Sequence, residues 1–244
     1  MNSDRDPGHV TQPPGDTPPV SAEGDHPYDF DMPLGEAMRT QRAIRRLTDE
    51  PVSDELVKQL IEFASKAPTA QNHQAWEFIV VRDRELIARL AKLNRRVWRL
   101  VDKPIAWLNR KDDKFIRTHR ATAHQVDNFE RIPVLIVCCM TATRHAPSPV
   151  VAASSYGSIF PAVQNLLLAA RAAGLGANLT TMPLTVNFAA RRVLGIPWKV
   201  TPVCIVPIGW PAGRYGPTVR KPVGEVTSID RYGNRAWLDT EGPG

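Results

Sequence analysis

The feature that most constrains the fold of this chain is a pair of short, uninterrupted apolar runs, IPVLIVCCM at 132–140 and TPVCIVPIG at 201–209. Runs of this length that are rich in β-branched residues predict buried strands. Further strands are expected at 76–81 and, briefly, within GLGANLTTM at 174–182. Helical segments separate these runs along the chain. The expected class is therefore α/β (α+β), with helices around a central sheet.

Helix signals occupy most of the remaining sequence. Ser53 is the expected N-cap of a helix at 53–67, and Pro68 ends that helix. A long helix at 154–173 is expected to stop at Gly174. Other helices are expected at 35–47, 85–93 and 187–195. The segment 95–130 is basic, aromatic and weakly periodic, so it predicts irregular helices that cover another part of the protein.

Length and composition bear on whether the chain is a globular, membrane, secreted or metal-binding protein. The 244 residues suit a single α/β domain, and 43% hydrophobic residues are enough for a large core. No apolar run approaches the roughly 18 residues that cross a bilayer. The N-terminus lacks the apolar centre of a signal peptide, so we expect a cytoplasmic protein without a membrane segment. Cys138, Cys139 and Cys204 lie in apolar runs and are expected to be reduced core residues rather than metal ligands.

Charge and proline divide the chain near residue 33. Residues 1–33 hold seven of the 22 prolines, and residues 1–34 carry a net charge of −6. Such a segment buries too little apolar surface to offset its ordering entropy, so 1–33 is expected to be a disordered tail before a domain at 34–244. The remainder is basic and attracts anions, which include nucleic acids and phosphorylated cofactors. No nucleic-acid-binding motif is present, so a cofactor is favoured.

Two arginine-bearing stretches are candidates for anion binding. QRAIRR contains Arg42 and Arg45, which would share one face of the expected helix at 35–47. The late loop GWPAGRYGPTVRKP contains Arg214, Arg220 and Lys221. A planar guanidinium matches phosphate geometry. The alternative for both stretches is an ordinary solvated basic surface.

Two polar stretches are candidates for contact with a flat heteroaromatic ring. The turn PTAQNHQ offers donors and acceptors on Thr69, Gln71, Asn72 and Gln74. The alternative is a turn that caps its own backbone. The stretch TTMPL, residues 180–184, could lay backbone amides along a ligand, or could simply run from a strand into a proline turn.

The sequence also lacks several common motifs. It has no GxGxxG after a strand, no GxxxxGK[ST] and no GxSxG, so a Rossmann site, a P-loop and a hydrolase serine are unsupported. Its histidines show no metal-ligand spacing.

The four stretches together, in their order, resemble the FMN-dependent nitroreductase superfamily. QRAIR stands where that family has Arg-Arg-Ser-x-Arg, and APTAQNHQAW where it has Ala-Pro-Ser-x-x-Asn-x-Gln-Pro-Trp. VQNLLLAARAAGLG and GWPAGRYGPTVRKP match its later helix and loop, so the resemblance covers roughly residues 35–230. TTMPL and VRKP are also similar to the iodotyrosine deiodinase branch. The resemblance implies a central mixed sheet and a homodimer that binds FMN at the subunit interface.

The resemblance assigns roles to individual residues. Arg42 and Arg220 match the phosphate contacts, and Arg45 matches a cation at the pyrimidine edge of the flavin. Thr69 and Asn72 match a turn beside the ring, from either subunit. The implied cofactor contacts are, in chain order, Arg42, Ala43, Arg45, Pro68, Thr69, Asn72, Thr180, Thr181, Met182 and Arg220.

Three positions depart from the family pattern. Gln41 replaces the first arginine, Ala43 replaces the serine, and Ala75 replaces a proline. Loss of the serine hydroxyl removes a phosphate hydrogen bond worth about 1 kcal/mol.

The implied reaction is ping-pong oxidation of NADPH or NADH, with a nitroaromatic or quinone as acceptor and no catalytic residue beyond the flavin. Trp98, Trp107, Phe115 and Arg120 could form a lid over the substrate, and ordinary helical packing is the equal alternative. The competing functions are reductive dehalogenation, flavin breakdown, and a flavin store or sensor with little turnover. The sequence implies no role for the acidic N-terminal tail, and residues 225–244 are expected to form a C-terminal extension of the domain.

Overall fold

The computed structural model describes residues 30–141 and 148–235. Its centre is a four-stranded sheet in the order β1-β2-β4-β3. The strands are β1 (Trp76–Val81), β2 (Val134–Met140), β3 (Gly176–Ala177) and β4 (Thr201–Gly209). Every pairing between them is antiparallel. The α+β class is confirmed, and the described strands form an antiparallel sheet where the resemblance implied a mixed one.

The two apolar runs form the central strands because both faces of the sheet are covered. β2 is buried along its whole length, and its alternate residues enter two different cores. Cys138 faces one core and Cys139 the other, as adjacent strand residues should. All three thiols are free and buried, which confirms the expectation from sequence. Burial raises the pKa of Cys139 to about 12, so this thiol stays protonated.

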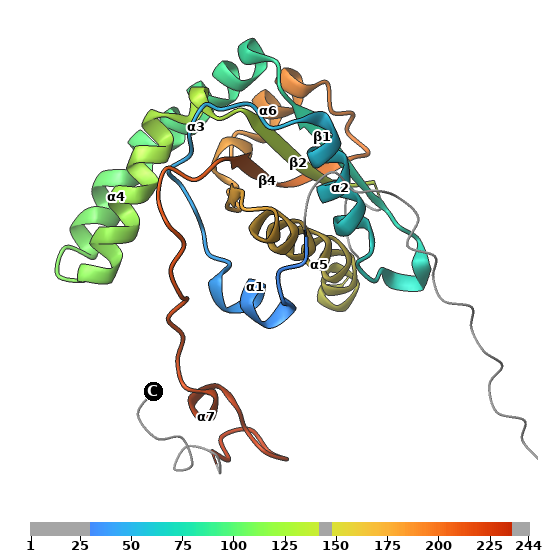
Figure 1. Cartoon of the computed structure of the whole chain (residues 1–244), viewed down its shortest axis with the longest axis vertical. Coiled ribbons are helices and arrows are strands. Elements are labelled where there is room, and N and C mark those ends of the chain that lie inside the picture. The colour runs from blue at the N-terminus through green and yellow to red at the C-terminus, as the bar shows by residue number, and fades with distance from the viewer. Residues whose placement is uncertain (1–29, 142–147, 236–244) are drawn as a thin grey trace, which may run out of the picture.

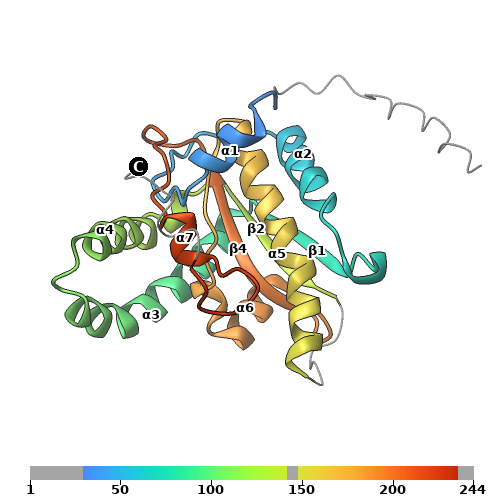
Figure 2. The ribbon, with the colours of Figure 1, turned by 90° about the horizontal axis from the view of Figure 1, so that it is seen from below.

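Helices cover the sheet on both faces (Figures 1 and 2). One face packs against α2 (Asp54–Ser65) and α5 (Pro149–Ala172). The other packs against α3 (Arg84–Leu108), α6 (Asn187–Leu194) and the short 3-10 turns η2 (Phe129–Arg131) and η3 (Met182–Leu184). Ser53 caps α2 as predicted, because its Oγ accepts from the backbone N–H of Leu56 at 3.2 Å.

The expected helix at 35–47 is wrong in its second half. α1 spans Leu34–Thr40, and Gln41 already has extended backbone angles. The following residues instead run beside the sheet, where Ile44 N donates to Ala177 O at 3.0 Å and Leu47 forms a bridge with Pro211. These hydrogen bonds replace those of a helix. Arg42 and Arg45 therefore do not share a helix face.

The basic segment 95–130 forms two regular helices rather than irregular ones. α3 continues to Leu108, well past the expected end at residue 93, and α4 spans Asp113–Asp127. The two pack as a hairpin that projects from one side of the molecule (Figure 1). His119 of α4 faces α3, where Asp102 Oδ1 accepts a hydrogen bond from its Nε2 at 2.6 Å. The hairpin therefore has a packed interior of its own.

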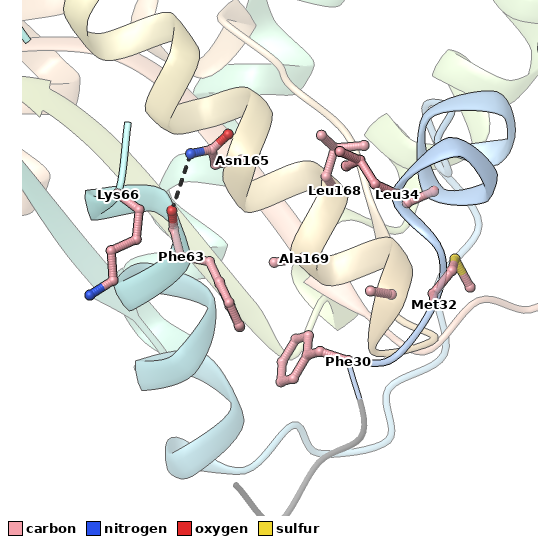
Figure 3. A pocket seen from close by; sticks show the side chains of 10 residues that line it. Phe30, Met32, Leu34, Phe63, Lys66, Asn165, Leu168 and Ala169 are labelled. Carbon is pink, nitrogen blue, oxygen red and sulfur yellow. Dashed lines mark hydrogen bonds between the residues drawn. The ribbon is translucent and has the colours of Figure 1, made fainter. Parts of the chain in front are cut away.

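The ends of the described chain add detail to the domain boundary. Phe30 packs on Phe63 with ring centroids 4.8 Å apart, so the packed body includes a residue before the expected boundary at 34. Phe30 and Met32 line an apolar hollow of about 300 Å³ between α2 and α5 (Figure 3). Residues 1–29 of the expected tail lie outside the described residues.

At the other end, α7 (Val223–Val226) follows an extended stretch that leaves the body of the molecule (Figure 1). None of the described helices combines the length and apolar character that a bilayer span needs.

Candidate functional site

The extended segment 42–47 is held between β3 and the loop after β4. Its contact with β3 is the hydrogen bond from Ile44 described above. On the other side, Ala212 N donates to Arg46 O at 3.0 Å and Thr48 N donates to Trp210 O at 2.8 Å. These bonds fix the backbone that carries Arg42 and Arg45.

The stretch between β4 and α7, residues 210–222, folds back onto the same region, and we call it the C-terminal loop. Thr218 donates to Arg39 O through both its backbone N–H, at 3.0 Å, and its hydroxyl, at 3.1 Å. Tyr215 donates its phenol to Leu175 O, and the Arg171 guanidinium lies over the Tyr215 ring at 4.1 Å. Burial raises the pKa of Tyr215 to about 12, so the phenol remains a donor. The loop thus brings Arg220 toward Arg42 and Arg45.

A cavity of about 570 Å³ forms where these segments meet α4, and we call it the cation cavity. Among the lining residues that the structure describes, five are cationic and none is acidic. The lining residues are Arg42, Ala43, Arg45, Lys114, Arg117, Thr118, Ala121, Pro217, Thr218, Val219 and Arg220. The structure therefore brings together four residues predicted from sequence, namely Arg42, Ala43, Arg45 and Arg220.

The cations of this cavity lack acidic partners. Within residues 30–141 and 148–235, none of the five forms an ion pair. Arginines elsewhere do so, as Arg131 with Asp49 at 3.0 Å. Burial lowers the pKa of Arg45, because desolvation penalises its charge. Crowded cations without counter-charges favour the binding of an anion.

Sequence analysis missed the α4 side of the cavity. Lys114, Arg117, Thr118 and Ala121 recur three and four residues apart, the spacing that places side chains on one helix face. This spacing is visible in the sequence, but the segment 95–130 is basic throughout, so the spacing does not distinguish these residues from the other cations there.

The turn before β1 has an unusual backbone. Gln71, Asn72 and Gln74 have φ of 52°, 55° and 49°, the left-handed region that residues other than glycine rarely adopt. Side chains stabilise it from within, as Gln74 N donates to Thr69 Oγ1 at 3.1 Å and Gln74 Nε2 to Asn72 Oδ1 at 3.2 Å. The self-capping alternative is thus correct for part of the turn. Strained turns of this kind are also frequent at functional sites.

The same turn borders a second cavity of about 410 Å³, which we call the serine cavity. Thr69 lines it together with serines of α5, and Ser158 Oγ accepts from Ala70 N at 3.2 Å. Its lining residues are Thr69, Ala70, His73, Gln74, Ala75, Met140, Thr141, Ser154, Ser155 and Ser158. This set shares no residue with the cation cavity. Within one chain, the predicted cofactor residues therefore fall into separate groups.

The strand-end residues 180–182 belong to neither cavity. Thr180 exchanges both backbone hydrogen bonds with Ile205, at 2.9 and 2.8 Å. Its N–H is therefore engaged in the fold. Pro68 and Asn72 likewise line neither cavity, although both flank Thr69 in the turn.

The four lid candidates line neither cavity. Trp98 and Phe115 pack on His119, with ring centroids 5.0 and 5.4 Å away. Trp107 is 64% exposed and carries Arg110 over its ring at 4.9 Å. Arg120 is exposed. In this single chain, Trp98 and Phe115 have the packing role that was the alternative to a lid.

A family model described as "Nitroreductase family" matches residues 38–210, which contain both central strands, the turn and the segment of Arg42. The chain belongs to the nitroreductase family. A protein of Methanothermobacter thermautotrophicus named "Putative NADH dehydrogenase/NAD(P)H nitroreductase" is 30% identical over 187 residues, 76% of this chain and 81% of that protein. The iodotyrosine deiodinase of Nematostella vectensis is 23% identical over 196 residues, 78% of this chain and 72% of that enzyme.

Solved structures agree on the fold. The NADPH:FMN oxidoreductase of Vibrio harveyi complexed with NAD+ superposes with a TM-score of 0.63 at 20% identity, covering 82% of this chain and 77% of that one. The NfrA1 protein of B. megaterium gives a TM-score of 0.64 at 23% identity, covering 82% and 74%. The family match and the 30% identical relative, rather than these structures, indicate that this nitroreductase-family protein is an oxidoreductase.

One glycine sets the position of the arginine segment in this nitroreductase fold. A Cβ on Gly176 would lie 2.6 Å from Leu47 Cδ2 and 2.8 Å from Ile44 Cγ2. We expect Gly176→Ala to cost about 1–3 kcal/mol of unfolding free energy, because Ile44 and Leu47 must move away from the added methyl group. Urea titration measures this cost. The double variant Ile44→Ala/Gly176→Ala should lose less unfolding free energy than the sum of the losses in its two single variants. Strictly additive losses would contradict a direct contact between the added methyl group and Ile44.

Proposed function

We propose that the protein is an FMN-dependent oxidoreductase that takes electrons from NADPH or NADH and gives them to a nitroaromatic or quinone acceptor. The observation that carries the proposal is the cation cavity, where the described residues of a nitroreductase-family fold supply five cations and no carboxylate. A phosphate monoester carries close to two negative charges at neutral pH, and arginine forks bind it with paired hydrogen bonds. The donor set therefore fits FMN.

Each predicted residue has a distinct role in this proposal. Arg42 and Arg220 hold the phosphate of FMN. Arg45 lies at the pyrimidine edge of the ring system, where its positive charge favours reduction. It is half-buried, so this charge is less screened by water than an exposed one. Bound FMN supplies two-electron transfer between the nicotinamide and the acceptor, while the protein contributes binding, orientation and charge.

The separation of the two cavities supports a site shared by two copies of the chain. We propose that Thr69 and Asn72 approach the ring from a second subunit, and that residues 180–182 lie beside it through their side chains. Large apolar side chains on the outer helices are available for such an interface. They include Leu34 at 63% exposure, Met38 at 57%, Tyr156 at 44% and Phe160 at 41%. Light scattering at micromolar concentration should report a homodimer, and a monomer would contradict the shared site.

The reaction is tested by the visible spectrum of the purified protein, followed by anaerobic titration with each nicotinamide. We expect a flavin spectrum that NADPH or NADH bleaches and that a nitroaromatic or quinone restores. FMN that stays oxidised with both nucleotides would contradict the reductase assignment and favour a store or sensor. If only a halogenated phenol reoxidises the protein, the reaction is dehalogenation, the activity for which the deiodinase relatives are named.

A further inference from the structure

Two of the five cations in the cation cavity have no part in the proposed FMN contacts. Lys114 and Arg117 line the cavity from α4, whereas Arg42, Arg45 and Arg220 come from the extended segment and the C-terminal loop. They lie three residues apart on one helix face. The cavity therefore holds more positive charge than one flavin phosphate needs.

The helix that carries this pair is fixed at both ends. At its start, Asp112 Oδ1 accepts from Lys114 N at 2.8 Å and from Phe115 N at 3.1 Å. Toward its end, Gln125 and the buried Asn178 exchange two hydrogen bonds, at 2.6 and 3.2 Å. Lys114 and Arg117 are thus presented by an ordered helix, which lowers the entropy cost of binding a ligand.

Lys114 and Arg117 are exposed, and the charge around them suits a doubly charged anion. A solvated basic face usually interleaves cations with acids, but among the described residues no acid lines this cavity. Asp112 is occupied as the helix cap. Asp113 lies four residues before Arg117, yet no ion pair joins them in the described part of the chain. Two cations without partners on one helix face suit a phosphate monoester.

We propose that Lys114 and Arg117 bind the 2′-phosphate of NADPH and so make the protein select NADPH over NADH. The inference rests on the proposed function, because it requires a nicotinamide nucleotide in this cavity beside FMN. The two nucleotides differ only in that phosphate, so discrimination must come from groups that meet it. A carboxylate on the acceptor is the competing ligand for the pair.

Binding to the full-length holoprotein tests the pair without turnover. Adenosine 2′,5′-bisphosphate and adenosine 5′-phosphate differ by the same phosphate, and calorimetry gives the Kd of each. We expect the bisphosphate to bind about 10- to 100-fold more tightly, and the ratio to fall to near one in Lys114→Ala/Arg117→Ala. The control Arg89→Ala/Lys92→Ala removes one arginine and one lysine with the same spacing from the exposed face of α3, outside the cavity, and should keep the ratio.

Kinetics with both nucleotides provide the second measurement. In Lys114→Ala/Arg117→Ala, kcat/KM for NADPH should fall about 10- to 100-fold, while kcat/KM for NADH changes less than about threefold. FMN content should remain at the wild-type level, because Arg42 and Arg220 are intact.

The outcomes separate this inference from the proposed function. Equal losses of kcat/KM for NADPH and NADH in Lys114→Ala/Arg117→Ala would overturn the assignment of this pair to the 2′-phosphate. The assignment would also fail if the double variant kept the wild-type preference for adenosine 2′,5′-bisphosphate over adenosine 5′-phosphate. A wild-type protein that binds both adenosine phosphates equally would overturn it as well. A holoprotein that selects the bisphosphate but oxidises neither nicotinamide would support the phosphate site and refute the proposed reaction.

Discussion

Replacing Arg42 and Arg220 together with alanine is expected to give a protein that loses its flavin on dialysis. Both residues line the cation cavity and neither has an acidic partner among the described residues. A hydrogen bond to a charged group contributes about 1.5–3 kcal/mol. Loss of both arginines should therefore weaken FMN binding by about 10²- to 10⁴-fold. Fluorescence titration of the apoprotein with FMN measures the change directly.

The controls for this variant separate local contact from general charge. Arg96→Ala/Arg99→Ala removes two exposed arginines of α3 that lie outside the cavity, and it should retain FMN. Arg220→Ala alone should show an intermediate loss. Arg42→Lys should restore only part of the affinity, because an ammonium lacks the paired donors of a guanidinium. If the double alanine variant stays fully yellow through dialysis, the phosphate of FMN is not bound by these two arginines in the cation cavity.

The sequence predicted the strands well because each is a local pattern. The runs at 132–140 and 201–209 contain β2 and β4, and residues 76–81 form β1 with the expected bounds. The end of α1 could not be predicted in the same way. The chain leaves the helix at residue 41 because Ile44 finds a hydrogen-bond partner on Ala177, more than 130 residues away. Only the folded sheet supplies that partner.

The candidate site shows the same division. Arg42, Ala43, Arg45 and Arg220 were selected from separated motifs, and the structure gathers them in one cavity. Lys114 and Arg117 were not selected, since their role depends on where α4 packs. The polar sequence at 68–74 predicts a turn, but it does not show that Gln71, Asn72 and Gln74 adopt left-handed backbone angles. Backbone strain arises from the surrounding structure that imposes it, so composition alone does not predict it.

The largest loss of stability is expected from Phe129→Ala. Phe129 is fully buried and has the greatest volume of the fully buried side chains in the described residues. It lies in η2, directly after α4, in the core that also holds Leu90 of α3 and Leu135 of β2. Truncating a buried phenylalanine removes its apolar contacts and leaves a cavity, at a cost of about 3–5 kcal/mol. Urea unfolding at one fixed protein concentration gives the change in unfolding free energy.

The same variant connects the core with the α4 side of the cation cavity. η2 connects α4 to β2, so a loosened Phe129 position frees the C-terminal end of α4. The same helix carries Lys114 and Arg117 near its start. We therefore expect Phe129→Ala to weaken adenosine 2′,5′-bisphosphate binding more than FMN binding. Phe129→Leu fills most of the space and should cost less than about 1.5 kcal/mol. Phe188→Ala, at a side chain 63% exposed, should change stability by less than about 1 kcal/mol. A Phe129→Ala loss no larger than that of Phe188→Ala would mean that this core does not anchor the hairpin.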